Sequence, residues 1–122
     1  MGYRTFREFL AISEQQGRLR RITKSVDRSW QPAALAKWAF QALSDDDRFG
    51  LLFDHVDGSD FRLVTGALGA STHTYALGLG VSRDEINEKW MQALLNPMPP
   101  QIVDTAPCQE VVRTGDDIRL GD

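Results

Sequence analysis

The chain has 122 residues, of which 42% are hydrophobic and 25% charged, so its composition is that of an ordinary globular protein. This length predicts a single domain that can bury a core without metal or disulfide staples. Fourteen lysines and arginines against seventeen aspartates and glutamates give a net charge of −3, which argues against a domain that binds nucleic acid through its phosphates.

The cysteine content and the start of the sequence indicate a compartment. Cys108 is the one cysteine in the sequence and can form no intrachain disulfide, which is typical of a reducing environment. The start lacks the apolar run of a signal peptide, and no apolar stretch approaches the ~20 residues that span a bilayer. We therefore expect a cytoplasmic protein with neither a nucleic-acid nor a membrane partner.

The first elements in chain order are a helix and a strand. Thr5 followed three residues later by Glu8 is typical of a capping box, and Gly17 offers a left-handed stop, so we predict a helix over about 5–16. Apolar and basic residues then mix over 19–22, which predicts a short strand. One face of that strand is expected to be solvated and to carry the arginines Arg18, Arg20 and Arg21.

A second helix is the best-supported element of the sequence. Pro32 suits its first turn, and apolar residues follow at helical spacing: Leu35, Trp38, Ala39, Ala42 and Leu43. This stripe predicts that Trp38 packs in the core. The acids of 45–47 then oppose the macrodipole at the end of the helix, so we expect a mobile turn there and no calcium site, because calcium loops interleave their ligands around a glycine.

The middle of the chain predicts a β-hairpin. The apolar runs 51–56 and 61–65 flank the turn-forming residues 57–60, which indicates a four-residue connection at the centre of the sheet. Turn chemistry explains the acids of this region, so we do not assign them acid-base catalysis: Asp54, Asp57 and Asp60.

Two further helices and an extended tail complete the prediction. Ser71 can cap a short helix through about Gly78, and a second capping box at Ser82 and Glu85 predicts a helix over about 83–95 whose apolar face includes Trp90. Prolines at 97, 99 and 100 then force an extended passage. Two short strands are expected beyond it, at 102–103 and 111–112.

The residues show no self-sufficient active site. His55 and His73 lack the further ligands that a metal site needs, and the glycines of 78–80 leave a helix and lack the third glycine of a dinucleotide fingerprint. Cys108 has no histidine partner in its surroundings, so we expect its thiol to serve packing. We therefore predict no catalytic, cofactor-binding or metal-binding residue in this chain, and a mixed α+β (α/β) fold with a small sheet, a central hairpin and three to four helices.

Short segments in a fixed order resemble a known family. FREFL at 6–10, LLFDHVDG at 51–58 and ALGLG at 76–80 occur in that order, and the most specific segments are NPMPP, APCQEVV and GDDI at 96–100, 106–112 and 115–118. Together they resemble the amino-terminal domain of the UbiD family, the prenylated-FMN-dependent decarboxylases. The likeness covers nearly the whole chain.

The resemblance implies a part of a larger enzyme. It implies reversible non-oxidative decarboxylation of an aromatic or α,β-unsaturated acid by a homo-oligomer that uses prenylated FMN, a divalent metal such as manganese, and potassium. Family members continue through a flavin-binding domain and an oligomerisation domain, which carry the family's catalytic and metal-binding residues, so none of these is carried over here.

Two readings of the chain remain open. In the first it is a fragment in which residues 1–96 form the core of a supporting domain and 97–122 lead towards the flavin-binding domain. In the second it is a stand-alone small subunit or regulatory module that completes a separate catalytic chain. The reading frame beyond Asp122 distinguishes them.

Overall fold

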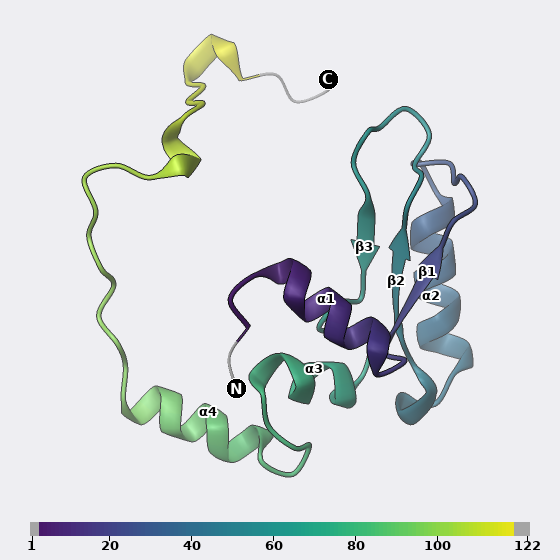
Figure 1. The fold of residues 1–122 in the computed structure, drawn as a ribbon, viewed down its shortest axis with the longest axis horizontal. Coiled ribbons are helices and arrows are strands. Elements are labelled where there is room, and N and C mark those ends of the chain that lie inside the picture. The colour runs from purple at the N-terminus through teal and green to yellow at the C-terminus, as the bar shows by residue number, and fades with distance from the viewer. Residues whose placement is uncertain (1–2, 119–122) are drawn as a thin grey trace.

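The computed structural model describes residues 3–118 of the chain. These residues form a single small α+β domain with four α-helices and one three-stranded mixed sheet (Figure 1). The predicted fold class is confirmed. Over the same residues no helix is both long and apolar enough to cross a bilayer.

The sheet joins one parallel and one antiparallel pair of strands. Its strands are β1 (Leu19–Ile22), β2 (Gly50–Phe53) and β3 (Leu63–Thr65), with β2 in the centre. β1 and β2 are parallel, so the chain must cross over between them, and α2 (Gln31–Ala42) forms that crossover. β2 and β3 are antiparallel.

The hairpin prediction is confirmed for this pairing and wrong for its connection. The strands end at Phe53 and resume only at Leu63, which leaves a connection longer than four residues. Val56 lies outside the β2–β3 ladder and forms isolated bridges with Val26 and Ser59. Gly58 lies in the turn that joins Val56 to Ser59, and its φ of +77° is a conformation that favours glycine.

The main core lies between the sheet and α2. Phe53 and Ala39 are fully buried at its centre, and the rest of the buried cluster consists of Val26, Phe49, Leu51 and Val56. The prediction that Trp38 belongs to this core is wrong, since 57% of its surface is exposed. Ala39, the next residue of α2, faces the sheet with no exposed surface, whereas Trp38 lies 100° around the helix from it, at the edge of the packed face.

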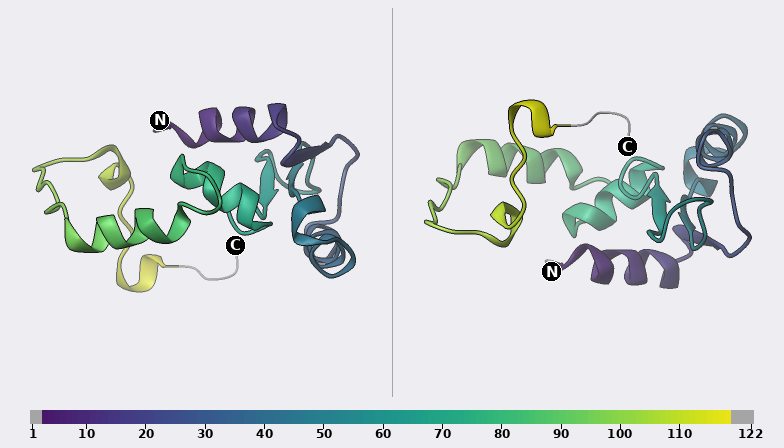
Figure 2. Two further views of the ribbon diagram at one scale, coloured as in Figure 1. Left: turned by 90° about the horizontal axis from the view of Figure 1, so that it is seen from below. Right: turned by 90° about the horizontal axis from the view of Figure 1, so that it is seen from above.

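The opposite side of the sheet is covered by α1 (Phe6–Gln15), as Figure 2 shows. The predicted start is confirmed: the Thr5 hydroxyl accepts a hydrogen bond from the Glu8 amide at 3.2 Å. The Glu8 carboxylate accepts in turn from the Arg4 amide at 2.9 Å, one residue before the expected partner. The helix ends before Gly17, whose φ of +69° gives the predicted left-handed stop.

Two shorter helices follow the sheet. α3 (Thr72–Leu79) begins after the predicted cap Ser71, which forms a capping box with Thr74, and ends at Gly80 with φ +68°. α4 (Ile86–Leu95) begins three residues later than expected because 83–85 form a separate turn, in which the Glu85 carboxylate accepts from the Ser82 amide at 2.9 Å. Trp90 is about half exposed, which contradicts its predicted core role, and its indole donates to the Tyr75 hydroxyl at 2.8 Å.

The tail after α4 does not contain the predicted strands. Residues 102–103 and 111–112 are exposed and lack regular structure, because no strand of the described chain lies beside them to pair with. Two short 3-10 turns, Pro107–Gln109 and Gly115–Asp117, interrupt the tail. Cys108 is exposed, so the prediction that its thiol packs is wrong. The prediction for 97–122 also includes residues 119–122, which lie outside the described part.

Candidate functional site

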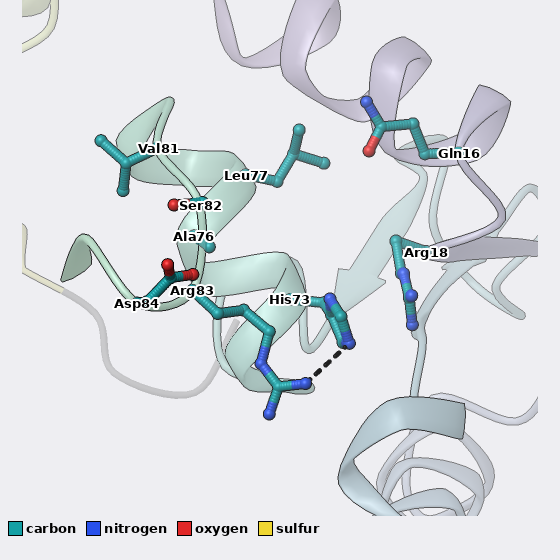
Figure 3. A pocket seen from close by; sticks show the side chains of 9 residues that line it. All are labelled: Gln16, Arg18, His73, Ala76, Leu77, Val81, Ser82, Arg83 and Asp84. Atoms are coloured by element: carbon teal, nitrogen blue, oxygen red, sulfur yellow. Dashed lines mark hydrogen bonds between the residues drawn. The ribbon is translucent and has the colours of Figure 1, made fainter.

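A polar cleft lies between the end of α1 and the turn that joins α3 to α4 (Figure 3). Its volume is about 520 Å³. Gln16 and Arg18 form one wall, residues 81–84 form the other, and α3 contributes the floor, where His73 lies.

Three consecutive acids follow α2, and two of them, Asp45 and Asp46, contact residues of this cleft. They form the 3-10 turn η1 (Asp45–Asp47), which contacts the start of α3. The Asp45 carboxylate accepts from the amide of Thr72 at 3.2 Å and also from its hydroxyl. These bonds lower the pKa of Asp45. The predicted turn is present at 45–47. Its acids follow one helix in sequence, but Asp45 faces the N-terminus of the next helix, where the helix dipole favours it.

Asp46 connects η1 to the opposite wall of the cleft. Its Oδ1 atom lies 3.0 Å from Nε2 of His73 and accepts from the Arg83 guanidinium at 2.7 Å. The hydrogen bond with His73, followed by the charge of Arg83, lowers the pKa of Asp46. The Asp46 carbonyl also accepts from Arg18 at 2.6 Å. Asp46 thus joins three parts of the chain.

The charges of the cleft compensate one another. Arg83 lies between the carboxylates of Asp45 and Asp46. A nitrogen of its guanidinium is 3.1 Å from Nε2 of His73, and the two groups lie side by side in Figure 3. An incoming anion would have to displace these acids. The arrangement therefore acts as a polar clamp that holds η1, α3 and the α3–α4 turn together. Sequence reasoning missed it, since its members Asp45 and Arg83 are 38 residues apart.

The other acids singled out in the sequence belong to a second surface network. Asp54 accepts from Arg21 at 3.0 Å, and the same guanidinium binds both oxygens of Glu14 at 2.9 Å. The hydrogen bond with Glu14 raises the pKa of Arg21 and lowers that of Glu14. Asp57 accepts from the Ser25 hydroxyl. These contacts link α1, β1 and the loops after β1 and β2. Arg20 and Arg21 are both exposed, but neighbouring residues of a strand point to opposite faces, so the prediction that one face of β1 carries all three arginines is wrong.

Over residues 3–118, no three His, Cys, Asp or Glu side chains converge on one point. His73 is held by Asp46 and Arg83, and His55 is exposed on the loop after β2.

The last feature is an exposed apolar surface on α4 and the tail. No residue of 90–118 is buried, yet the segment is rich in large apolar side chains. We call this set the apolar flank: Trp90, Met91, Leu94, Leu95, Met98, Ile102, Val103, Val111, Val112 and Ile118. Large apolar side chains exposed in such number along one segment are typical of a surface that a partner covers.

Known proteins are similar to this chain in sequence and in fold. Residues 10–94 match the family described as the 3-octaprenyl-4-hydroxybenzoate carboxy-lyase N-terminal domain, UbiD_N. The phenolic acid decarboxylase of Sedimentibacter hydroxybenzoicus is 31% identical over 120 residues, which cover 90% of this chain and 24% of that protein.

Solved structures agree with the sequence match. An evolved dimeric form of the UbiD-class enzyme HmfF from Pelotomaculum thermopropionicum, in complex with prFMN, aligns over 83% of this chain and 22% of its own, with TM-score 0.68 and 34% identity. The vanillic acid decarboxylase ShVdcCD of S. hydroxybenzoicus, in its open form with truncated ShVdcD, aligns over 95% and 26%, with TM-score 0.70 and 28% identity. The chain spans about a quarter of the length of these relatives. With 85 matched residues out of 122 and this shared fold, the chain belongs to the UbiD family, as a member of its N-terminal domain.

Proposed function

We propose that this chain is the supporting domain of a prFMN-dependent carboxy-lyase that decarboxylates an aromatic or α,β-unsaturated carboxylic acid. Family membership supports the enzyme class, and the relatives include a phenolic acid decarboxylase, a vanillic acid decarboxylase and an enzyme solved with prFMN. The relatives are about four times as long, so the chemistry is assigned to the remainder of a longer polypeptide.

The observation that carries this proposal is the apolar flank. A supporting domain needs a surface that is apolar before it docks, and α4 has an apolar stripe but no buried residue. Leu94 and Leu95 are each more than two-thirds exposed. Burying such side chains contributes roughly 1.5–3 kcal/mol each, so docking of this flank would be strongly favoured.

The polar cleft does not fit the cofactor or its ions. The cations of the polar cleft are already bound to Asp45 and Asp46, which leaves no free set of donors for a flavin phosphate. No acidic cluster within residues 3–118 has metal-binding geometry. We therefore assign prFMN, a divalent metal such as manganese, and potassium to the remainder of the enzyme, and assign no catalytic step to this domain.

The proposal is tested on the gene product that contains this domain. We expect Leu94→Asp with Leu95→Asp to reduce decarboxylation and prFMN retention together, because charged side chains would oppose docking of α4. The matched control is Trp38→Asp, since Trp38 is exposed to a similar degree but lies on α2, away from the flank. Equal activity in both variants and the parent would contradict the docking role.

The isolated 122-residue chain supplies a second test. After incubation with prFMN and manganese and removal of free ligand, we expect no flavin absorbance and no decarboxylation above the rate without protein. Stoichiometric retention of flavin would overturn the assignment. Intact-mass measurement of the cellular gene product also separates the two readings: a mass of 13.7 kDa would favour a stand-alone subunit over a domain of a longer chain.

A further inference from the structure

A second concave surface lies between α1 and β3, and it differs from the polar cleft in having an apolar floor. This groove has a volume of about 320 Å³. Leu52 and Val64 are directly opposite each other in the antiparallel register, so both side chains point to the α1 side of the sheet. Leu10 of α1 closes the floor at one side.

Two aromatic side chains line the groove. Phe6 and Phe61 are 54% and 82% exposed, which is unusual for phenylalanine in a folded domain. The Phe6 ring stacks on Phe9 with ring centroids 6.2 Å apart, and the backbone amide of Phe61 donates to the Ser59 hydroxyl at 3.1 Å. The groove therefore offers two flat apolar surfaces to a ligand.

The charged residues of the groove decide the polarity of its ligand. Arg7 and Arg62 line it, and neither forms an ion pair or a side-chain hydrogen bond within residues 3–118. Asp60 is the one acid of the lining. Glu14, the acid whose pKa Arg62 also influences, is bound through both oxygens by Arg21. The groove thus has a net positive charge, with two guanidinium groups available.

We propose that this groove binds a small amphipathic carboxylate, with its apolar body between Phe6 and Phe61 and its carboxylate on Arg7 or Arg62. Guanidinium groups bind carboxylates through paired, charge-assisted hydrogen bonds, which gives the anion an advantage over neutral or cationic ligands. The volume is at the lower end of the ~300–1,000 Å³ of ligand sites, so it suits one ring with a short acid arm. The inference is independent of the proposed function.

The test uses the 122-residue chain and three probes that share one ring: phenylacetate, 2-phenylethanol and 2-phenylethylamine. Binding is followed by amide chemical shifts in NMR spectra. We expect phenylacetate to shift the amides of 6–10, 52 and 61–64, and to bind roughly ten-fold more tightly than the alcohol or the amine.

Variants assign the effect to the groove. Arg7→Gln with Arg62→Gln should lower phenylacetate affinity to that of the alcohol, and Phe61→Ala should weaken all three probes. Arg113→Gln removes one positive charge from the exposed tail and should change nothing. Equal binding of the three probes, unchanged binding in the double arginine variant, or shifts spread over other surfaces would each overturn the proposal. A dispersed amide spectrum shows that each variant is folded.

Discussion

Two regions of the chain are both rich in apolar side chains but differ in burial: the sheet with α1 and α2, and the apolar flank. Phe53 of β2 has no exposed surface, whereas Ile102 of the tail is 93% exposed. In the sheet region each apolar face has a second layer to pack against. By contrast, α4 packs mainly against α3. An apolar stripe therefore predicts which side of a helix or strand favours burial. Whether that side is buried depends on the elements that pack against it.

Hydrogen exchange should reveal the largest difference between the two regions. In the isolated chain, amides of 35–43 in α2 should open only near the global unfolding free energy, typically about 5–15 kcal/mol. Amides of Val111 and Val112 should open at ~0–3 kcal/mol, because no ladder protects them. Equal protection in the two segments would show that the tail packs on its own domain.

Truncation of an apolar side chain should separate the regions by several kcal/mol. Phe53→Ala should destabilise the isolated chain by ~3–5 kcal/mol, since it leaves a cavity in the core. Val112→Ala should fall within about ±0.5 kcal/mol. Both values come from urea unfolding followed by circular dichroism. A cost above 1 kcal/mol at Val112 would mean that the flank is already packed.

A pair of nearby glycines tests how tightly β3 and α2 meet. Gly66 has φ +65°, and an added Cβ would lie 2.9 Å from the Phe40 ring. We expect Gly66→Ala to cost about 1–3 kcal/mol through backbone strain and this clash. Gly69 has open space around its Cα, so Gly69→Ala is the control and should be nearly neutral. Similar melting temperatures for the two variants would contradict this.

A buried hydroxyl offers a stabilising change. The Thr65 hydroxyl is buried and has no hydrogen-bond partner within the described residues. Thr65→Val should stabilise the chain by ~1 kcal/mol, because an unsatisfied buried polar group is removed and valine suits a strand. In Thr74, by contrast, the hydroxyl donates to the Leu68 carbonyl at 2.9 Å, so Thr74→Val should destabilise. A loss of stability in Thr65→Val would indicate a partner for that hydroxyl.

The smallest effect concerns acid stability. The pKa values of Asp45 and Asp46 are lowered from 3.8 in the folded state, so their ionised forms stabilise it above that pH. This stabilisation is lost as the pH falls through the lowered values. We expect Asp46→Asn to flatten the fall in melting temperature below about pH 4, compared with the parent chain. A parallel curve would contradict the clamp.

The local signals in the sequence predicted most of the fold. Thr5 with Glu8, Gly17 and Ser71 each mark a helix boundary through contacts within a few residues, and the structure has helices at these places. The β2–β3 pairing also follows from sequence neighbours. The parallel pairing of β1 with β2 was not predicted, because it joins segments about 30 residues apart.

The errors concern burial and long-range polar contacts. The stripes of α2 and α4 include Trp38 and Trp90, and nothing in the sequence shows that the opposing layer ends before these side chains. The sequence places the acids of η1 directly after α2, so they were expected to oppose its dipole. In the structure η1 contacts α3. Their partners His73 and Arg83 follow by 27 and 37 residues at no recognisable spacing.

The position of His73 has a consequence for where its ring proton resides. Nε2 lies 3.0 Å from a carboxylate oxygen of Asp46 and 3.1 Å from a nitrogen of Arg83. A carboxylate can only accept and a guanidinium can only donate, so one ring nitrogen serves one of them at a time. With hydrogen on Nδ1 alone, the ring accepts from Arg83; with hydrogen on Nε2, it donates to Asp46. The tautomer of a single imidazole therefore decides whether its Nε2 atom links α3 to the turn that leads to α4, or adds to the bonds that Thr72 of α3 already makes with η1.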